Sequence, residues 1–282
     1  MRRRRDKYGF GPINLYNSIQ LKDRPIQKIK FNADSIMTSF SDQCANQYNR
    51  FILRIMRQKL IRIYSHPRSG THYLAALMGM NFYPFLFLSK ENIERGHWSD
   101  RKVYPEGFGY AKLFGSHRFP AEDLSNIGLP ALYIYRDGRA VAWSVWKTPG
   151  CLHQDLKGIS FPEFLRMKLD WTGSPGMRDR EKNGYTIGQH WKAHVEAWHR
   201  VKARHYLILR YEDLVLKTDE TLLRIREKFP FLIFRKKFKN PLKLVGHLPN
   251  EGSTDAWKEH YRTEDLDYFR SAVGEHCPYL YS

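Results

Sequence analysis

Three short apolar runs, each followed by a segment with helical periodicity, dominate the pattern of hydrophobic and polar positions. The runs are Leu60–Tyr64, Leu132–Tyr135 and Tyr206–Leu209. Apolar runs of this length predict buried strands. Strands that alternate with helices predict a mostly parallel central sheet covered on both faces. We therefore expect an α/β fold.

Helical spacing predicts a helix after each strand and several more along the chain. An amphipathic helix is expected over Tyr48–Lys59, with Phe51, Ile52, Ile55 and Met56 packed on the sheet. The other predicted helices have these inward positions: Tyr73, Leu74, Leu77 and Met78; Ala140–Trp146; Ile187, Trp191, Val195, Trp198 and Val201 within Thr186–Lys202; Leu222, Ile225 and Phe229 after a capping Thr218; and Leu266, Phe269 and Val273.

Composition fits a globular protein with a strong basic bias. The chain has 282 residues, 42% of them apolar, and a net charge of +18 from 47 basic and 29 acidic residues. The run Arg2–Arg5 carries four of these charges, and removing them from +18 leaves +14. Such a surplus favours an anionic partner: nucleic acid, acidic lipid or a polyanionic cofactor. We expect residues 1–58 to form a basic extension that packs on a single domain, 59–282.

Cysteine spacing and hydropathy indicate the cellular compartment of the protein. Cys44, Cys151 and Cys277 lie far apart, which predicts neither a disulfide framework nor a zinc site and favours a reducing compartment. The sequence has no run of 18 apolar residues and no signal-peptide pattern after the arginines. We expect a soluble, cytoplasmic protein without a membrane partner or a metal.

The segment Ser65–Thr71 has the composition of a phosphate-binding loop. It reads Ser-His-Pro-Arg-Ser-Gly-Thr and joins the first predicted strand to a helix. Backbone N–H groups and the helix dipole attract an anion at such a turn, and Arg68 adds a full charge. The nucleotide triphosphate loop needs a second glycine and a following Lys, which are absent here. An ordinary turn with a capping Ser or Thr is the alternative.

A second strand–loop–helix unit also carries arginine at its turn. Arg136 follows the strand Leu132–Tyr135, and Ser144 lies two turns into the next helix. Ligands of open α/β sheets bind at the carboxyl ends of the strands. Two such units suggest two anionic groups on one ligand. The alternative is that Arg136 pairs with Asp137 or another carboxylate on the surface.

Two further stretches have candidate chemistry. His117 follows a strand-like piece within Tyr110–Pro120, where a histidine can serve as general base because its ordinary pKa is close to neutral. A structural histidine is the alternative. The aromatic stretch 81–109 suits an acceptor pocket or the core, and Cys151–Gly184 suits a mobile cover.

In order and spacing, these motifs resemble those of the soluble sulfotransferases that use 3′-phosphoadenosine 5′-phosphosulfate (PAPS). The resemblance rests on His66–Tyr73, on Arg136 with Ser144 eight residues later, on Tyr211–Leu214, and on Gly252 with Trp257 and Lys258. It covers residues 60–270. The resemblance implies the sulfotransferase fold with a P-loop-like phosphosulfate-binding loop.

The resemblance also implies a role for each matching residue. The 5′-phosphosulfate would contact Arg68, Ser69, Gly70, Thr71 and His72. Arg136 and Ser144 would hold the 3′-phosphate, with Asn250 and Gly252 closing over it. Tyr73 and Tyr211 would lie at the adenine. His117 would be the catalytic base and Arg68 would stabilise charge in the transition state, with adenosine 3′,5′-bisphosphate as the product and no metal.

The sequence departs from the family pattern at four places. Arg68 replaces the commoner Lys, so its role narrows to electrostatics because arginine stays charged. His72-Tyr73 replaces Thr-Trp, and Gly115-Ser116 replaces Lys-Thr. Asn250-Glu251 replaces Arg-Lys, and a carboxylate there would repel a phosphate; Lys243 or His247 would have to compensate.

The acceptor is the open part of the prediction. The resemblance favours sulfation of a hydroxyl or amine on a small molecule, such as a natural product, with no nucleic-acid partner. A carbohydrate sulfotransferase, a basic nucleic-acid-binding protein and a P-loop-like kinase are the alternatives. Oligomeric state is open.

Overall fold

A computed structural model describes most of the chain from the first predicted strand onward. The described residues are 44, 47–48, 51–83, 113, 116–120, 130–148, 152, 156–172, 180–234, 237–238 and 253–281. The chain divides into two units, Met1–Gln43 and Cys44–Ser282, and all described residues belong to the second. The proposed extension 1–58 and the aromatic stretch 81–109 lie mostly outside the described residues, and both stay predictions.

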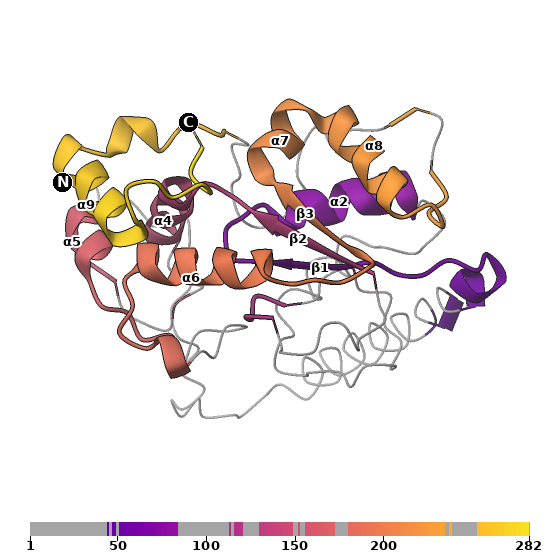
Figure 1. The fold of residues 1–282 in the computed structure, drawn as a ribbon, viewed down its shortest axis with the longest axis horizontal. Coiled ribbons are helices and arrows are strands. Elements are labelled where there is room, and N and C mark those ends of the chain that lie inside the picture. The colour runs from indigo at the N-terminus through magenta and orange to yellow at the C-terminus, as the bar shows by residue number, and fades with distance from the viewer. Residues whose placement is uncertain are drawn as a thin grey trace, which may run out of the picture. The chain divides into compact units, whose positions relative to one another are not determined.

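A parallel three-stranded sheet forms the centre of the described residues (Figure 1). The strands are β1 (Arg62–Ser65), β2 (Ala131–Tyr135) and β3 (Tyr206–Arg210), in the order β1-β2-β3. Tyr64 pairs with Tyr133, and Tyr133 with Ile208, both in parallel register. The predicted α/β class with a parallel sheet is confirmed.

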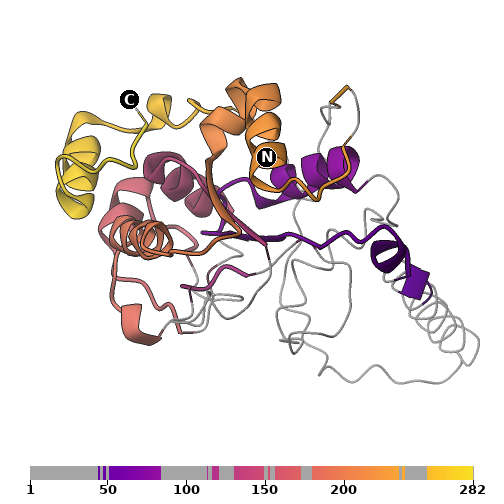
Figure 2. The same cartoon turned by 45° about the vertical axis from the view of Figure 1, so that its right-hand side comes forward.

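Helices cover both faces of the sheet (Figures 1 and 2). Alternate residues of β2 point to opposite sides: Tyr133 packs in one core cluster, and Leu132 and Ile134 pack in the other. The first layer consists of α4 (Gly138–Lys147), α5 (Phe161–Arg166), α6 (Ile187–His199) and α9 (Thr263–Val273). The second consists of α2 (Thr71–Phe82), α7 (Tyr211–Leu216) and α8 (Thr218–Lys228). Two short 3₁₀ turns, η2 (Arg180–Lys182) and η3 (Lys258–His260), are also present, and residues 51–55 are helical.

Three local predictions are wrong. Thr218 does not cap α8. Lys217 precedes the helix and Thr218 is its first residue, and the Thr218 hydroxyl donates to the carbonyl of Leu214 at 2.8 Å. Phe51 and Ile55 do not pack on the sheet, since both are about 60% exposed (61% and 60%). The predicted mobile cover Cys151–Gly184 contributes core residues instead, among them Leu156, Phe164 and the fully buried Trp171.

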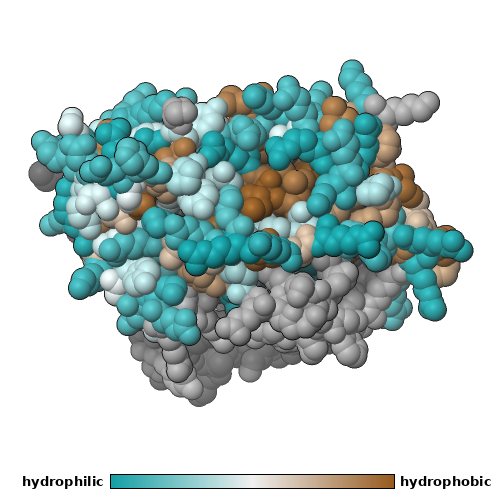
Figure 3. Space-filling model, viewed as in Figure 1, coloured by the Kyte–Doolittle hydropathy of each residue, from teal (hydrophilic) through white to brown (hydrophobic). Residues whose placement is uncertain are grey.

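The surface seen in Figure 3 is mostly hydrophilic, with hydrophobic residues gathered near the middle of the view. No helix among the described residues is both long and apolar enough to cross a membrane.

Candidate active site

The predicted phosphate loop joins β1 to α2 at the carboxyl edge of the sheet. Gly70 precedes the helix in the left-handed region (φ 89°), and Arg68 also has a positive φ of 67°. A Cβ at Gly70 would overlap the ring of Tyr211, so only glycine fits. The first turn of α2 has no acidic residue and no side-chain cap. The alternative of an ordinary Ser- or Thr-capped turn is therefore wrong, and the turn has the features of an anion site.

Contacts within the loop fix its polar side chains. The Thr71 and Ser65 hydroxyls lie 2.6 Å apart. Ser69 is fully buried, and its hydroxyl has no hydrogen-bond partner in the part of the chain that the structure describes. His72 is half-buried on the first turn of α2, and Tyr73 is buried with its ring edge-on to Tyr211 at 6.3 Å. The predicted loop residues thus gather around one helix start.

The second predicted unit meets the first directly. Arg68 donates from Nε to the Ser144 hydroxyl on α4 at 2.9 Å. The Arg136 guanidinium lies over the Tyr211 ring at 4.7 Å, and its Nη2 donates to the Ser253 carbonyl at 2.8 Å. The Arg136 Nε is buried without a hydrogen-bond partner among the described residues. Residues far apart in sequence thus form one basic site.

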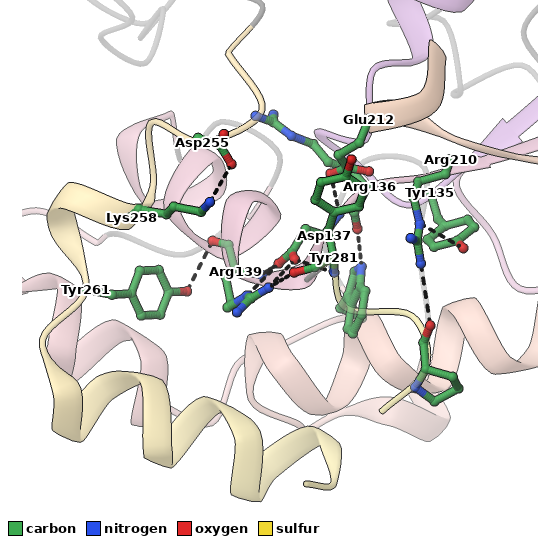
Figure 4. A network of polar contacts seen from close by, with 12 residues as sticks. Tyr135, Arg136, Asp137, Arg139, Arg210, Glu212, Asp255, Lys258, Tyr261 and Tyr281 are labelled. Atoms are coloured by element: carbon green, nitrogen blue, oxygen red, sulfur yellow. Dashed lines mark hydrogen bonds and ion pairs between the residues drawn. The ribbon is translucent and has the colours of Figure 1, made fainter. Parts of the chain in front are cut away.

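The alternative pairing of Arg136 with Asp137 is wrong, because Asp137 makes other contacts (Figure 4). Its carboxylate accepts from the side chain of Arg139, at 3.0 Å from Nε and 2.6 Å from Nη2, and from the backbone N–H of Tyr281 at 2.8 Å. Its own N–H donates to Glu212 at 2.9 Å. Asp137 therefore ties the β2–α4 turn to the β3–α7 turn and to the C-terminal segment, while Arg136 keeps its orientation toward Tyr211.

Glu212 was not singled out by the sequence analysis. It is buried, and desolvation raises the pKa of its carboxyl. One oxygen accepts from Asp137, and the other has no hydrogen-bond partner among the described residues. Its position directly after Tyr211 was the only available signal.

His117 lies behind the phosphate loop. Its Nδ1 is 2.7 Å from the Ser65 carbonyl oxygen and 3.1 Å from the Ser65 hydroxyl. Burial lowers its pKa to about 4, with a smaller contribution from His72 in the same direction. The prediction of a near-neutral pKa for His117 is therefore wrong. At pH 7 its ring is neutral, which is the form that a general base requires.

Helix α6 holds all three loops of the site with one buried face. His190 Nδ1 lies 3.2 Å from His66 Nε2. Trp191 Nε1 donates to the Arg136 carbonyl at 3.0 Å. His194 Nε2 lies 3.1 Å from the His117 carbonyl. The predicted inward face of this helix contained only apolar residues. The spacing of four residues between His190 and His194 places both on one side of a helix and could have indicated them.

Some predicted residues cannot be located. Asn250 and Gly252 lie outside the described residues, as do Gly115, Lys243 and His247. No group of three metal-ligating side chains that could hold an ion occurs in the described ranges.

Solved structures that are similar to this chain include two complexes with PAP. Mouse sulfotransferase SULT7A1 complexed with PAP has a TM-score of 0.48 and 15% identity, covering 77% of this chain and 84% of that one. Retinol dehydratase in complex with androsterone and inactive cofactor PAP has a TM-score of 0.48 and 12% identity, covering 76% and 79%. No curated protein sequence matches.

A family comparison matches the middle of the chain. Residues 119–229 match the family described as the sulfotransferase domain. The matched segment contains Arg136, Ser144 and Tyr211 and all of α6. The resemblance predicted from the motifs is confirmed over this segment.

Proposed function

We propose that this chain is a PAPS-dependent sulfotransferase of the EC 2.8.2 type. It transfers the sulfuryl group to a hydroxyl or amine of a small-molecule acceptor. The observation that carries the proposal is the contact between the two predicted anion sites: Arg68 of the phosphate loop bonds Ser144, and Arg136 lies over Tyr211, whose ring packs against Gly70. This arrangement supports one ligand with two separate anionic groups.

The residues present fit such a ligand. The Ser69 hydroxyl and Arg136 Nε are buried polar groups that lack hydrogen-bond partners within the described residues. Burying an unpaired polar group is costly, so these atoms favour an anion that would accept from both. When bound, PAPS supplies an activated sulfuryl group. Arg68, Ser69, Gly70, Thr71 and His72 would hold its 5′ side.

The remaining contacts separate PAPS from other nucleotides. Arg136 and Ser144 would hold the 3′-phosphate, because a guanidinium recognises phosphate by charge and by paired N–H groups. Tyr73 and Tyr211 would lie at the adenine. Asn250 and Gly252 would close the 3′ side.

His117 is the proposed base. Its Nδ1 faces the Ser65 carbonyl, which only accepts, so Nδ1 carries the proton and Nε2 carries the lone pair. Nε2 would take the proton of the acceptor hydroxyl or amine. A bound anion nearby would raise the His117 pKa from about 4 toward the range of a useful base. Arg68 would stabilise charge on the leaving oxygen.

Two classes of acceptor fit the proposed reaction. A small hydroxylated or amine-bearing compound, such as a natural product, is the first candidate, and a carbohydrate is the second. The net charge of +18 supports nucleic-acid binding as a separate alternative.

The test is a thermal-shift series followed by a transfer assay. We expect adenosine 3′,5′-bisphosphate at about 100 times its dissociation constant to stabilise the protein by roughly 2.7 kcal/mol. ADP and ATP–magnesium should have smaller effects. His117→Ala should abolish transfer from PAPS to a panel of phenols and amines while binding of the bisphosphate is retained; His205→Ala, at an exposed position, is the control.

Other results would redirect the proposal. A response to ATP–magnesium alone would favour a kinase. A response to DNA without one to the bisphosphate would favour the basic surface as the functional feature. Equal loss of binding and transfer in His117→Ala would make His117 a structural residue.

A further inference from the structure

The loop that carries His117 is held by side chains of α6. His194 Nε2 lies 3.1 Å from the His117 carbonyl oxygen and 3.2 Å from that of Arg118. Trp198 Nε1 donates to the same Arg118 carbonyl at 3.1 Å. The described residues 116–120 form no helix or strand, so these donors supply contacts that regular structure supplies elsewhere.

The surroundings of His194 fix its protonation. The two partners of His194 Nε2 are the carbonyl oxygens of His117 and Arg118. A carbonyl oxygen only accepts, so Nε2 carries the proton. Nδ1 then accepts from the hydroxyl of Tyr133, 2.9 Å away on the central strand β2. Burial keeps both groups in the form that this requires, because it lowers the pKa of His194 and raises that of Tyr133. The Tyr133 hydroxyl therefore donates to Nδ1 and orients the ring whose Nε2 donates to the loop.

A second contact orients the ring of His117 itself. Its Nδ1 donates to the Ser65 carbonyl at 2.7 Å, where β1 ends and the phosphate loop begins. The backbone of His117 is thus fixed from α6 and its ring from β1. The position of Nε2 therefore depends on both contacts.

We propose that His194 is a positioning residue for His117, with Tyr133 orienting the His194 ring. The hydrogen bond from His194 holds the His117 backbone so that the ring keeps its Nδ1 proton on Ser65. The catalytic consequence rests on the function proposed above. A reaction that depends on a placed base can lose about 100-fold in rate from a displacement of about 1 Å.

The test uses two amide substitutions that differ in where the donor lies. The Gln amide nitrogen reaches about as far as Nε2 of histidine, whereas the Asn amide reaches only as far as Nδ1. His194→Gln therefore retains the donor to the loop, and His194→Asn removes it. The two variants have similar polarity, so burial of a polar group affects both.

The first readout is the ring tautomer of His117 in ¹⁵N-histidine NMR spectra, with the signal assigned by its loss in His117→Ala. We expect a single Nδ1–H form in the wild type and in His194→Gln, and mixed tautomers in His194→Asn. The second readout is transfer from PAPS to 2-naphthol. In His194→Asn, kcat should fall about 10- to 100-fold while binding of adenosine 3′,5′-bisphosphate stays within about twofold.

The outcomes separate the inference from the proposed function. The same His117 spectrum in both variants would overturn the positioning role. Different spectra together with no binding of adenosine 3′,5′-bisphosphate by the wild type would support the positioning role and contradict the proposed function. If His194→Asn does not fold, Tyr133→Phe decides: it removes the hydroxyl that orients the His194 ring, so an unchanged His117 spectrum would contradict the positioning role.

Discussion

Arg136 is the residue whose surroundings say most about the ligand. Its guanidinium is oriented by the Tyr211 ring and by the Ser253 carbonyl. Its carbonyl is held by Trp191. A side chain with this many contacts is ordered before any ligand binds, which reduces the entropy lost on binding. Its Nε has no hydrogen-bond partner within the described ranges, although it is buried.

Arg136→Ala should weaken binding of adenosine 3′,5′-bisphosphate by roughly 1.5–3 kcal/mol, the usual contribution of a charged hydrogen bond. Binding of 5′-AMP should change little, because that ligand lacks the 3′-phosphate. Titration calorimetry with both ligands measures the difference. Arg224→Ala, which removes an exposed arginine of α8, controls for the lost charge. An unchanged preference for the bisphosphate would remove Arg136 from the site.

At the scale of elements, the site is a set of turns held together by buried polar contacts. Thr186 begins α6 with a capping box in which its side chain accepts from Gln189 N. Helix α6 then contacts the loops that carry His66, Arg136 and His117. Glu212 links the β3–α7 turn to the β2–α4 turn by accepting from the N–H of Asp137.

Glu212→Ala should lower the free energy of unfolding by about 1–3 kcal/mol, because it leaves the buried N–H of Asp137 without an acceptor. Glu212→Gln should cost much less, since it keeps an acceptor oxygen and removes a buried charge. Urea unfolding of the two variants at pH 7 measures the contrast. Equal stability would mean that the bond between the turns does not contribute.

For the whole molecule, buried histidines between the sheet and α6 couple stability to pH. His66, His117 and His194 are all buried. Burial lowers the pKa of each, well below the ordinary value for His66 and His194 and to about 4 for His117. The coulombic effect of neighbouring histidines acts in the same direction on His66 and His194.

We expect the free energy of unfolding to fall as the pH drops below about 6.5. The unfolded chain then binds protons on these histidines while the folded chain does not, so acid favours unfolding. Each group contributes up to about 1.4 kcal/mol per pH unit until its folded pKa is reached. Glu212 acts in the opposite direction because its folded pKa is raised.

Urea unfolding at pH 7, 6 and 5 measures the net effect. His205→Asn, at an exposed position, should show the same pH dependence as the wild type. A stability that stays constant between pH 7 and pH 5 would contradict burial of these rings in the neutral form.

Local sequence determined the strands, most helices and the motif residues at their ends. The runs Leu60–Tyr64 and Leu132–Tyr135 predicted β1 and β2 because burial on both faces requires continuous apolar residues. Arg68 and Arg136 were predicted to bind one ligand because parallel strands end at a common edge, and the family resemblance added Tyr211. That resemblance also implied the sulfotransferase domain, whose family model matches residues 119–229.

Only the tertiary structure decided which polar residues are buried and how they pair. The sequence indicated an apolar face on α6, but the loops of the site need hydrogen-bond donors there, and His190 and His194 supply them. It offered Asp137 as a partner for Arg136, whereas Asp137 binds Arg139 and the distant Tyr281. It gave His117 an ordinary pKa, and burial lowers that pKa to about 4. Periodicity records which side of an element is apolar, whereas desolvation and pairing depend on residues that meet only after the chain has folded.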